Sequence, residues 1–126
     1  MLIKIQPDIE KSKALEKMAK ITLQRLNEID VEKYPSNTLN DYYDIIHKLM
    51  EAHTLRKGVK IKGEGAHKEL IEHVSNELQL SEKDRLFLQK MRDYRNRIAY
   101  EGFFIHKNFI KLNKEKIIKI INHLSS

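Results

Sequence analysis

The sequence predicts an all-α fold, an antiparallel bundle of four main helices or five in all, and three observations support this. Apolar side chains recur at every third or fourth position through most of the 126 residues, which is the spacing of amphipathic helices. Gly, Pro and Asn fall between these periodic segments, where short helix connections are needed. Hydrophobic residues make up 40% of the chain and charged residues 33%, as in a folded helical domain. We expect a single domain over residues 1–126.

The first helix is expected after Pro7, with Asp8 as its N-cap. Proline cannot continue a helix backward, and an aspartate side chain accepts hydrogen bonds from the free N–H groups of the first turn. The predicted buried stripe of this helix comprises Leu15, Met18, Ala19, Thr22, Leu26 and Ile29.

A turn is predicted at residues 34–37, followed by a second helix in which Thr38 and Asp41 are spaced as a capping box. Gly58 is placed to end this helix, because glycine readily adopts the left-handed conformation found there. The predicted buried stripe comprises Leu39, Tyr42, Tyr43, Ile46, Leu49, Met50 and His53.

Residues 58–65 are rich in Gly and Lys and are predicted to form a loop. A third helix is expected to begin near Ala66 and to bury Leu70, Ile71, Val74 and Leu78. Ser81 and Asp84 are expected to cap the fourth helix, which Gly102 ends. Its predicted stripe comprises Phe87, Leu88, Met91, Tyr94 and Ile98.

Residues 103–112 look extended, and we expect either a short hairpin about Lys107-Asn108 or a loop packed by its aromatic side chains. Asn113 is expected to cap a last helix. That helix contains a nearly continuous set of buried side chains, Ile117, Ile118, Ile120, Ile121 and Leu124.

Composition excludes several classes of protein. The chain has no cysteine, so disulfides and thiolate metal sites are impossible. Its first residues turn polar too early for a signal peptide, and no run approaches the ~20 apolar residues that span a bilayer. We therefore expect a cytoplasmic protein without a membrane segment. The net charge of +6 favours anionic partners such as nucleic acids or nucleotides, although a lysine-rich surface also simply aids solubility.

Neither the histidines nor the glycines form a recognised motif. The six histidines include no His-x-x-x-His pair, so no metal site and no cofactor are predicted. Gly63-Glu64-Gly65 lacks the Gly-Lys-Ser/Thr that completes a phosphate loop. Lys57, Lys60 and Lys62 give this loop a basic character that suits contact with phosphates, but a solvated loop is the favoured interpretation.

The strongest cluster of candidate functional side chains lies between Arg92 and Gly102, where polar side chains follow a second face of the fourth helix. At 100° per residue, Arg92, Asn96 and Tyr100 step along a face beside the apolar stripe, and Arg95 flanks that stripe. One bundle core cannot bury both faces, so the pattern predicts a second interface with another subunit or a ligand. Guanidinium, amide and phenol groups suit phosphates and the edges of bases.

At these residues the sequence resembles the HEPN superfamily of small helical-bundle domains. The family signature is Arg-Asn-x-x-x-His near the end of a late helix, and Arg95-Asn96-Arg97-Ile98-Ala99 matches its first part. A second match is Gly58 followed by residues 66–71, Ala-His-Lys-Glu-Leu-Ile, which resembles the family's Gly…Ser-His-x-x-Leu-Ile at the third helix. The resemblance covers roughly residues 8–124. It implies a HEPN-like bundle and a homodimer that pairs the motif across the interface.

The histidine position of the motif holds Tyr100, and Gly102 replaces the tyrosine that toxin-type members carry two residues later. His106 lies outside the family spacing. The resemblance implies that in nuclease members arginine and histidine from both subunits flank the scissile phosphate, and that no metal takes part in cleavage. A phenol with a pKa near 10 is a poor base at neutral pH.

Three functions follow from these residues. The first is a dimeric module that binds RNA or a nucleotide through Arg92, Arg95, Asn96 and Tyr100, with little or no nuclease activity, as companion of a nucleotidyltransferase. The second is a divergent, toxin-like, metal-independent ribonuclease with Arg95 and Tyr100 as catalytic residues. The third is a purely structural helical oligomer.

Overall fold

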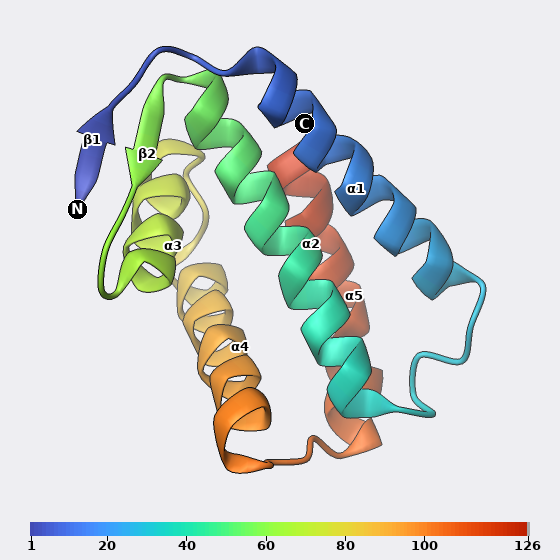
Figure 1. Ribbon diagram of the computed structural model, residues 1–126. Helices are drawn as coiled ribbons and strands as arrows, with labels where there is room; N and C mark the ends of the chain where they lie inside the picture. Colours follow the sequence, from blue (N-terminus) through green and yellow to red (C-terminus); the bar gives the residue numbers. More distant parts are fainter. Residues whose placement is uncertain (126) are drawn as a thin grey trace.

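The computed structural model of the chain describes residues 1–125 (Figure 1). Within that range the chain forms five helices and one two-stranded sheet, so the predicted all-α helical bundle is confirmed. In chain order the elements are β1 (Leu2–Lys4), α1 (Ile9–Asn27), α2 (Pro35–Arg56), β2 (Val59–Ile61), α3 (Ala66–Glu77), α4 (Glu82–Glu101) and α5 (Lys107–Ser125).

Helix α2 is the centre of the molecule, with α1 on one side and α4 on the other (Figure 1). Each of the other four helices packs against it. A helix surrounded in this way must be apolar on most of its circumference. Every residue of the predicted stripe of α2 is buried, and Tyr42, Ile46 and Met50 are completely inaccessible. Helices α1 and α4 run opposite to α2, whereas α5 runs in the same direction (Figure 1).

Local sequence signals set several helix ends as predicted. The side chain of Asp8 accepts a hydrogen bond from the backbone N–H of Lys11 and begins α1. The hydroxyl of Ser81 accepts one from the N–H of Asp84 and begins α4. Gly102, with φ +66°, ends α4 in the left-handed conformation.

The predicted stripe of α1 is wrong at two positions. Helix α1 ends at Asn27, so Ile29 lies beyond it with 49% of its surface exposed. Met18 is 48% exposed, whereas Ala19 and Leu26 are buried. Because α1 packs chiefly on α2, only a narrow face of it enters the core.

The predicted turn and capping box before α2 are also wrong. The helix begins at Pro35, where a missing N–H costs nothing, and Tyr34 precedes it as the N-cap. The hydroxyl of Thr38 donates to the carbonyl of Val31 instead of capping the helix. Asp41 forms an ion pair with Arg25 of α1, with 3.0 Å between the carboxylate and the guanidinium.

Part of the predicted glycine- and lysine-rich loop is a strand. Residues 59–61 form β2, which pairs antiparallel with β1 in the register Leu2 to Ile61 and Lys4 to Val59. The sheet fastens the N-terminus beside α2 and α3 (Figure 1). Lys60 is therefore held in a strand, not in a flexible loop.

The predicted extended segment 103–112 is wrong over its second half, because α5 begins at Lys107. Asn113 lies inside this helix and donates to the carbonyl of Phe109 one turn earlier, so it is not the cap. His106 precedes the helix, and its ring Nδ1 accepts a hydrogen bond from the N–H of Asn108. Among the described residues no helix is long and apolar enough to cross a bilayer.

Candidate functional site

Helix α4 carries the four residues predicted from the sequence, and three of them lie near one another. Arg95 donates to the side-chain oxygen of Asn96 at 3.4 Å. Arg92 is held by a hydrogen bond of 3.0 Å from its Nε to Gln89. All three side chains are half-buried. Tyr100, on the last turn of the helix, is 82% exposed.

Arg95 reaches into a cleft of about 310 Å³ between α2, α3 and α4. We call it the Arg95 cleft, and it is lined by Asn40, Asp41, Tyr43, Asp44, His47, His67, Arg95 and Ala99. Most of the wall comes from α2, so the central helix that forms the core also forms this surface. Of the four residues predicted to bind the ligand, only Arg95 lines the cleft, and Arg92, Asn96 and Tyr100 do not.

A set of three rings from α2 and α3 forms one wall. The imidazoles of His47 and His67 lie 4.2 Å apart between ring centroids, at an angle of 31°. The phenol of Tyr43 stacks on His67 with 6.3 Å between centroids and 22° between planes. Two imidazoles, each able to form hydrogen bonds, therefore lie side by side in the cleft.

The surroundings keep both imidazoles neutral near pH 7. Burial lowers the pKa of His67, and the positive charges of Arg95 and Arg92 lower it further, against an opposing effect of Glu51. Burial also lowers the pKa of His47, and its neighbour His67 adds to the effect. A neutral imidazole can donate at one ring nitrogen and accept at the other.

Tyr43 has a buried hydroxyl that is left without a partner. The residue is 2% exposed, and its OH makes no hydrogen bond to any described residue. Burial raises the pKa of this phenol to about 12, although Arg92 and Arg95 act against the rise. The side-chain oxygen of Asn40, also in the cleft, is likewise buried and unpaired among the described residues. A buried polar group without a hydrogen-bond partner destabilises the fold, and a bound ligand can supply that partner. Such groups are therefore typical of binding sites.

The ion pairs around the cleft leave the charge of Arg95 uncompensated. Asp41 is paired with Arg25 at 3.0 Å, and Asp44 with Lys48 at 2.7 Å. Within residues 1–125, no carboxylate forms an ion pair with Arg95. The acids of the cleft are thus neutralised by other cations, and the positive charge of Arg95 is available to an anion.

Asn40, Tyr43, His47 and His67 line the cleft but were not predicted as site residues. The histidine spacing within single helices gave no signal, because His47 and His67 meet across two helices. The available signal was the Gly…His-x-x-Leu-Ile match that includes His67, together with the placement of Tyr43 in a core stripe. In the part of the chain that the structure describes, no group of three or more metal-ligating side chains comes together.

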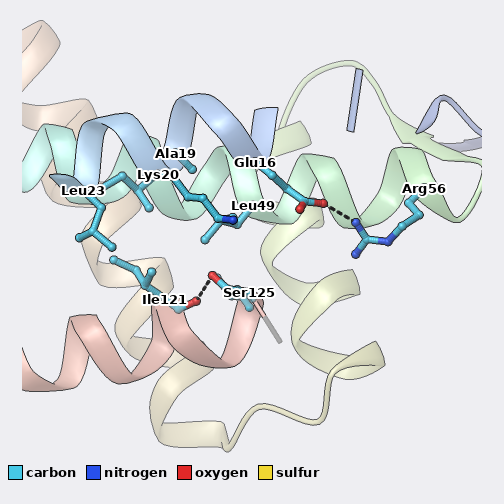
Figure 2. Close-up of a pocket in the computed structure, with 10 residues that line it drawn as sticks. Glu16, Ala19, Lys20, Leu23, Leu49, Arg56, Ile121 and Ser125 are labelled. Carbon is cyan, nitrogen blue, oxygen red and sulfur yellow. Dashed lines mark hydrogen bonds and ion pairs between the residues drawn. The ribbon is translucent and has the colours of Figure 1, made fainter. Parts of the chain in front are cut away.

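A second cleft, of about 360 Å³, lies between α1, α2 and α5. Glu16 and Arg56 form an ion pair of 2.6 Å at one end, and the hydroxyl of Ser125 donates to the carbonyl of Ile121 (Figure 2). Leu23 and Leu49 contribute apolar surface to it. Its arginine is already paired with Glu16, and it contains none of the ligand-binding residues predicted from the sequence. The Arg95 cleft is therefore the candidate functional site.

Searches for similar proteins found no match to this chain among protein-family models, curated proteins or solved structures.

Proposed function

We propose that the chain is a cytoplasmic, HEPN-like dimeric module that binds RNA or a nucleotide, with little or no nuclease activity, as companion of a nucleotidyltransferase. The observation that carries the binding function is the combination, in one cleft, of the unpartnered hydroxyl of Tyr43 with Arg95, which forms no ion pair with any described residue. A guanidinium on a helix is held in place before the ligand arrives, which favours tight contact with a phosphate. The net charge of +6 supports an anionic ligand.

The test is a titration of a fluorescently labelled RNA oligonucleotide, followed by anisotropy, with Arg95→Ala and Arg97→Ala. Both variants remove one positive charge from the same helix. Arg97 has its own partners, the ring of Phe103 at 4.1 Å and the carboxylate of Glu101 at 3.8 Å. We expect Arg95→Ala to weaken binding about tenfold or more and Arg97→Ala to weaken it only slightly. Equal losses would refute the site, because they would indicate a diffuse charge effect.

Metal-independent RNA cleavage is the second candidate function, and one observation favours it. The neutral imidazole of His67 lies beside the arginines, where a general base is needed, although the family histidine is replaced by Tyr100. Incubation of RNA with the protein in EDTA decides between the two functions. Cleavage that His67→Ala and Arg95→Ala both abolish would establish the nuclease, and intact RNA supports the binding module.

A further inference from the structure

Besides Arg95, the cleft contains more hydrogen-bonding side chains than one backbone phosphate would engage. Tyr43 offers a buried hydroxyl, and His47 and His67 offer two imidazoles within one stack. Together with Arg95 they provide hydrogen-bond donors from two sides of a small space. With a volume of about 310 Å³, the cleft is at the lower end for small-molecule sites, which suits one nucleotide or one strand end.

The charge of the cleft also exceeds that of a phosphodiester. Arg95 and His67 both line the cleft, so the imidazole becomes the second cation of the site once it is protonated. A diester in a nucleic-acid chain carries one negative charge. A phosphomonoester carries between ~1.5 and 2 charges near neutral pH. The monoester therefore matches Arg95 together with a protonated His67 better.

We propose that the Arg95 cleft receives a terminal phosphate, the phosphomonoester of an RNA end or a mononucleotide, and that His67 takes up a proton from solvent as this group binds. The inference rests on the proposed binding of RNA or nucleotide, and it defines which part of that ligand enters the cleft. Arg95 holds the phosphate from α4, and the imidazole of His67 binds it from α3.

The proton uptake follows from the charges that face His67. Arg92 and Arg95 from α4 disfavour its protonation, whereas Glu51 from α2 favours it. Lys60 from β2 lines the space on the far side of the two rings, and His47 lies against the ring face. A bound dianion offsets the charge of Arg95 and adds an acceptor for a second ring N–H. Both effects raise the pKa of His67, and the imidazolium adds a charge-assisted hydrogen bond.

The first experiment compares hexanucleotide RNAs of one sequence that carry a 5′-phosphate, a 3′-phosphate or hydroxyls at both ends. We expect one of the phosphorylated forms, or both, to bind about tenfold more tightly than the hydroxyl form. The preference should disappear in Arg95→Ala and persist in Arg97→Ala. If all three RNAs bind equally well but still depend on Arg95, the terminal-phosphate inference is wrong while the proposed binding function stands. If Arg95→Ala binds as well as wild type, the proposed function itself fails.

The second experiment measures proton uptake by calorimetry near pH 7 in two buffers of different ionisation enthalpy, using the preferred phosphorylated hexanucleotide. We expect a net uptake of up to about one proton per site in the wild type, lost in His67→Gln. Uptake that is absent, or that persists in His67→Gln, would overturn the role of His67. Circular dichroism checks that the variant folds. NMR titration of the wild-type histidines with and without the RNA reports the same event, because the pKa of His67 must rise on binding.

Discussion

Gly58 occupies a position that excludes any side chain, because its backbone conformation and its neighbours both forbid a Cβ atom. Its φ is +74°, and a Cβ added there would lie 2.9 Å from the carbonyl oxygen of Ile5 and 3.3 Å from the ring of Pro7. The close approach has a structural role, since the N–H of Ile5 donates to the carbonyl of Gly58 at 2.9 Å. The residue therefore joins the end of α2 to the segment that leads from β1 into α1.

We predict that Gly58→Ala lowers the free energy of unfolding by about 1–3 kcal/mol and more than Gly65→Ala does. Gly65 has nearly the same φ, +72°, but a Cβ there would meet nothing within 4 Å. The difference between the two losses of unfolding free energy thus measures the contact with Ile5 separately from backbone strain. Urea unfolding of both variants measures it, and equal losses would show that strain alone makes Gly58 necessary.

Residue-level prediction reached only part of the candidate site. The spacing within the fourth helix predicted a face with Arg92, Asn96 and Tyr100 and with Arg95 beside it. Of these residues only Arg95 lines the cleft, and Tyr100 is exposed on the last turn. Spacing could not indicate that His47 and His67 stack, because their contact depends on how α2 and α3 pack. Helix packing is set by side-chain surfaces far apart in sequence, which no local pattern describes.

At the scale of elements, periodicity identified the helices, and non-local contacts decided what periodicity missed. Strands β1 and β2 have three residues each and are separated by more than fifty positions, so neither is recognisable alone. Helix α5 was predicted to start too late because its first turns are rich in strand-favouring residues. Ile110 there is fully buried, and Ile117 follows it by two turns on the same face, so packing on α2 outweighed local preference.

A hydrogen bond between α2 and α3 makes a pH dependence predictable. Glu77 and His53 are 2.7 Å apart between Oε1 and Nε2, and His73 is 3.7 Å from the same oxygen. The hydrogen bond from His53 holds the pKa of Glu77 below its usual range, with burial acting against it. A carboxyl with a depressed pKa stabilises the fold above its unfolded pKa, about 4.3, and that stabilisation is lost as the pH falls through the folded value.

We therefore predict that Glu77→Gln lowers the free energy of unfolding at pH 7 by less than about 1 kcal/mol. The difference from wild type should disappear in acid. The magnitude is small because 38% of the Glu77 side chain is exposed. Urea unfolding between about pH 7 and pH 3 provides the measurement. Glu115→Gln, an equal change of charge at an exposed position of α5, serves as the control. Parallel pH profiles for both variants would contradict a specific contribution of the pair.

At the scale of the whole molecule, the arrangement around α2 separates two exposed apolar surfaces. Tyr100 and Phe104, at the end of α4 and just beyond it, are 82% and 83% exposed. On α1, on the other side of α2, Met18 and Ile21 are 48% and 47% exposed (Figure 1). The Arg95 cleft lies on the α4 side. A subunit that covers Tyr100 would thus border the cleft, whereas one that covers α1 would not.

We predict a homodimer in which Tyr100 and Phe104 of the two subunits lie near the twofold axis. An isologous contact lets one surface serve both copies, and it removes large aromatic side chains from water. The double variant Tyr100→Asp, Phe104→Asp should be monomeric, because it would bring like charges together and desolvate them at the axis. Static light scattering at high micromolar concentration measures the mass.

The matched control for this prediction is Met18→Asp, Ile21→Asp, which adds the same charges to the α1 surface and should leave the dimer intact. A monomeric wild type would contradict the interface outright, and dissociation of the α1 variant alone would move it to the opposite side of α2. The monomeric double variant also separates assembly from binding. Since Tyr100 does not line the cleft of its own chain, RNA affinity that survives in the monomer means that one subunit holds the ligand. Affinity that is lost with the dimer means that the partner's copy of this surface completes the site.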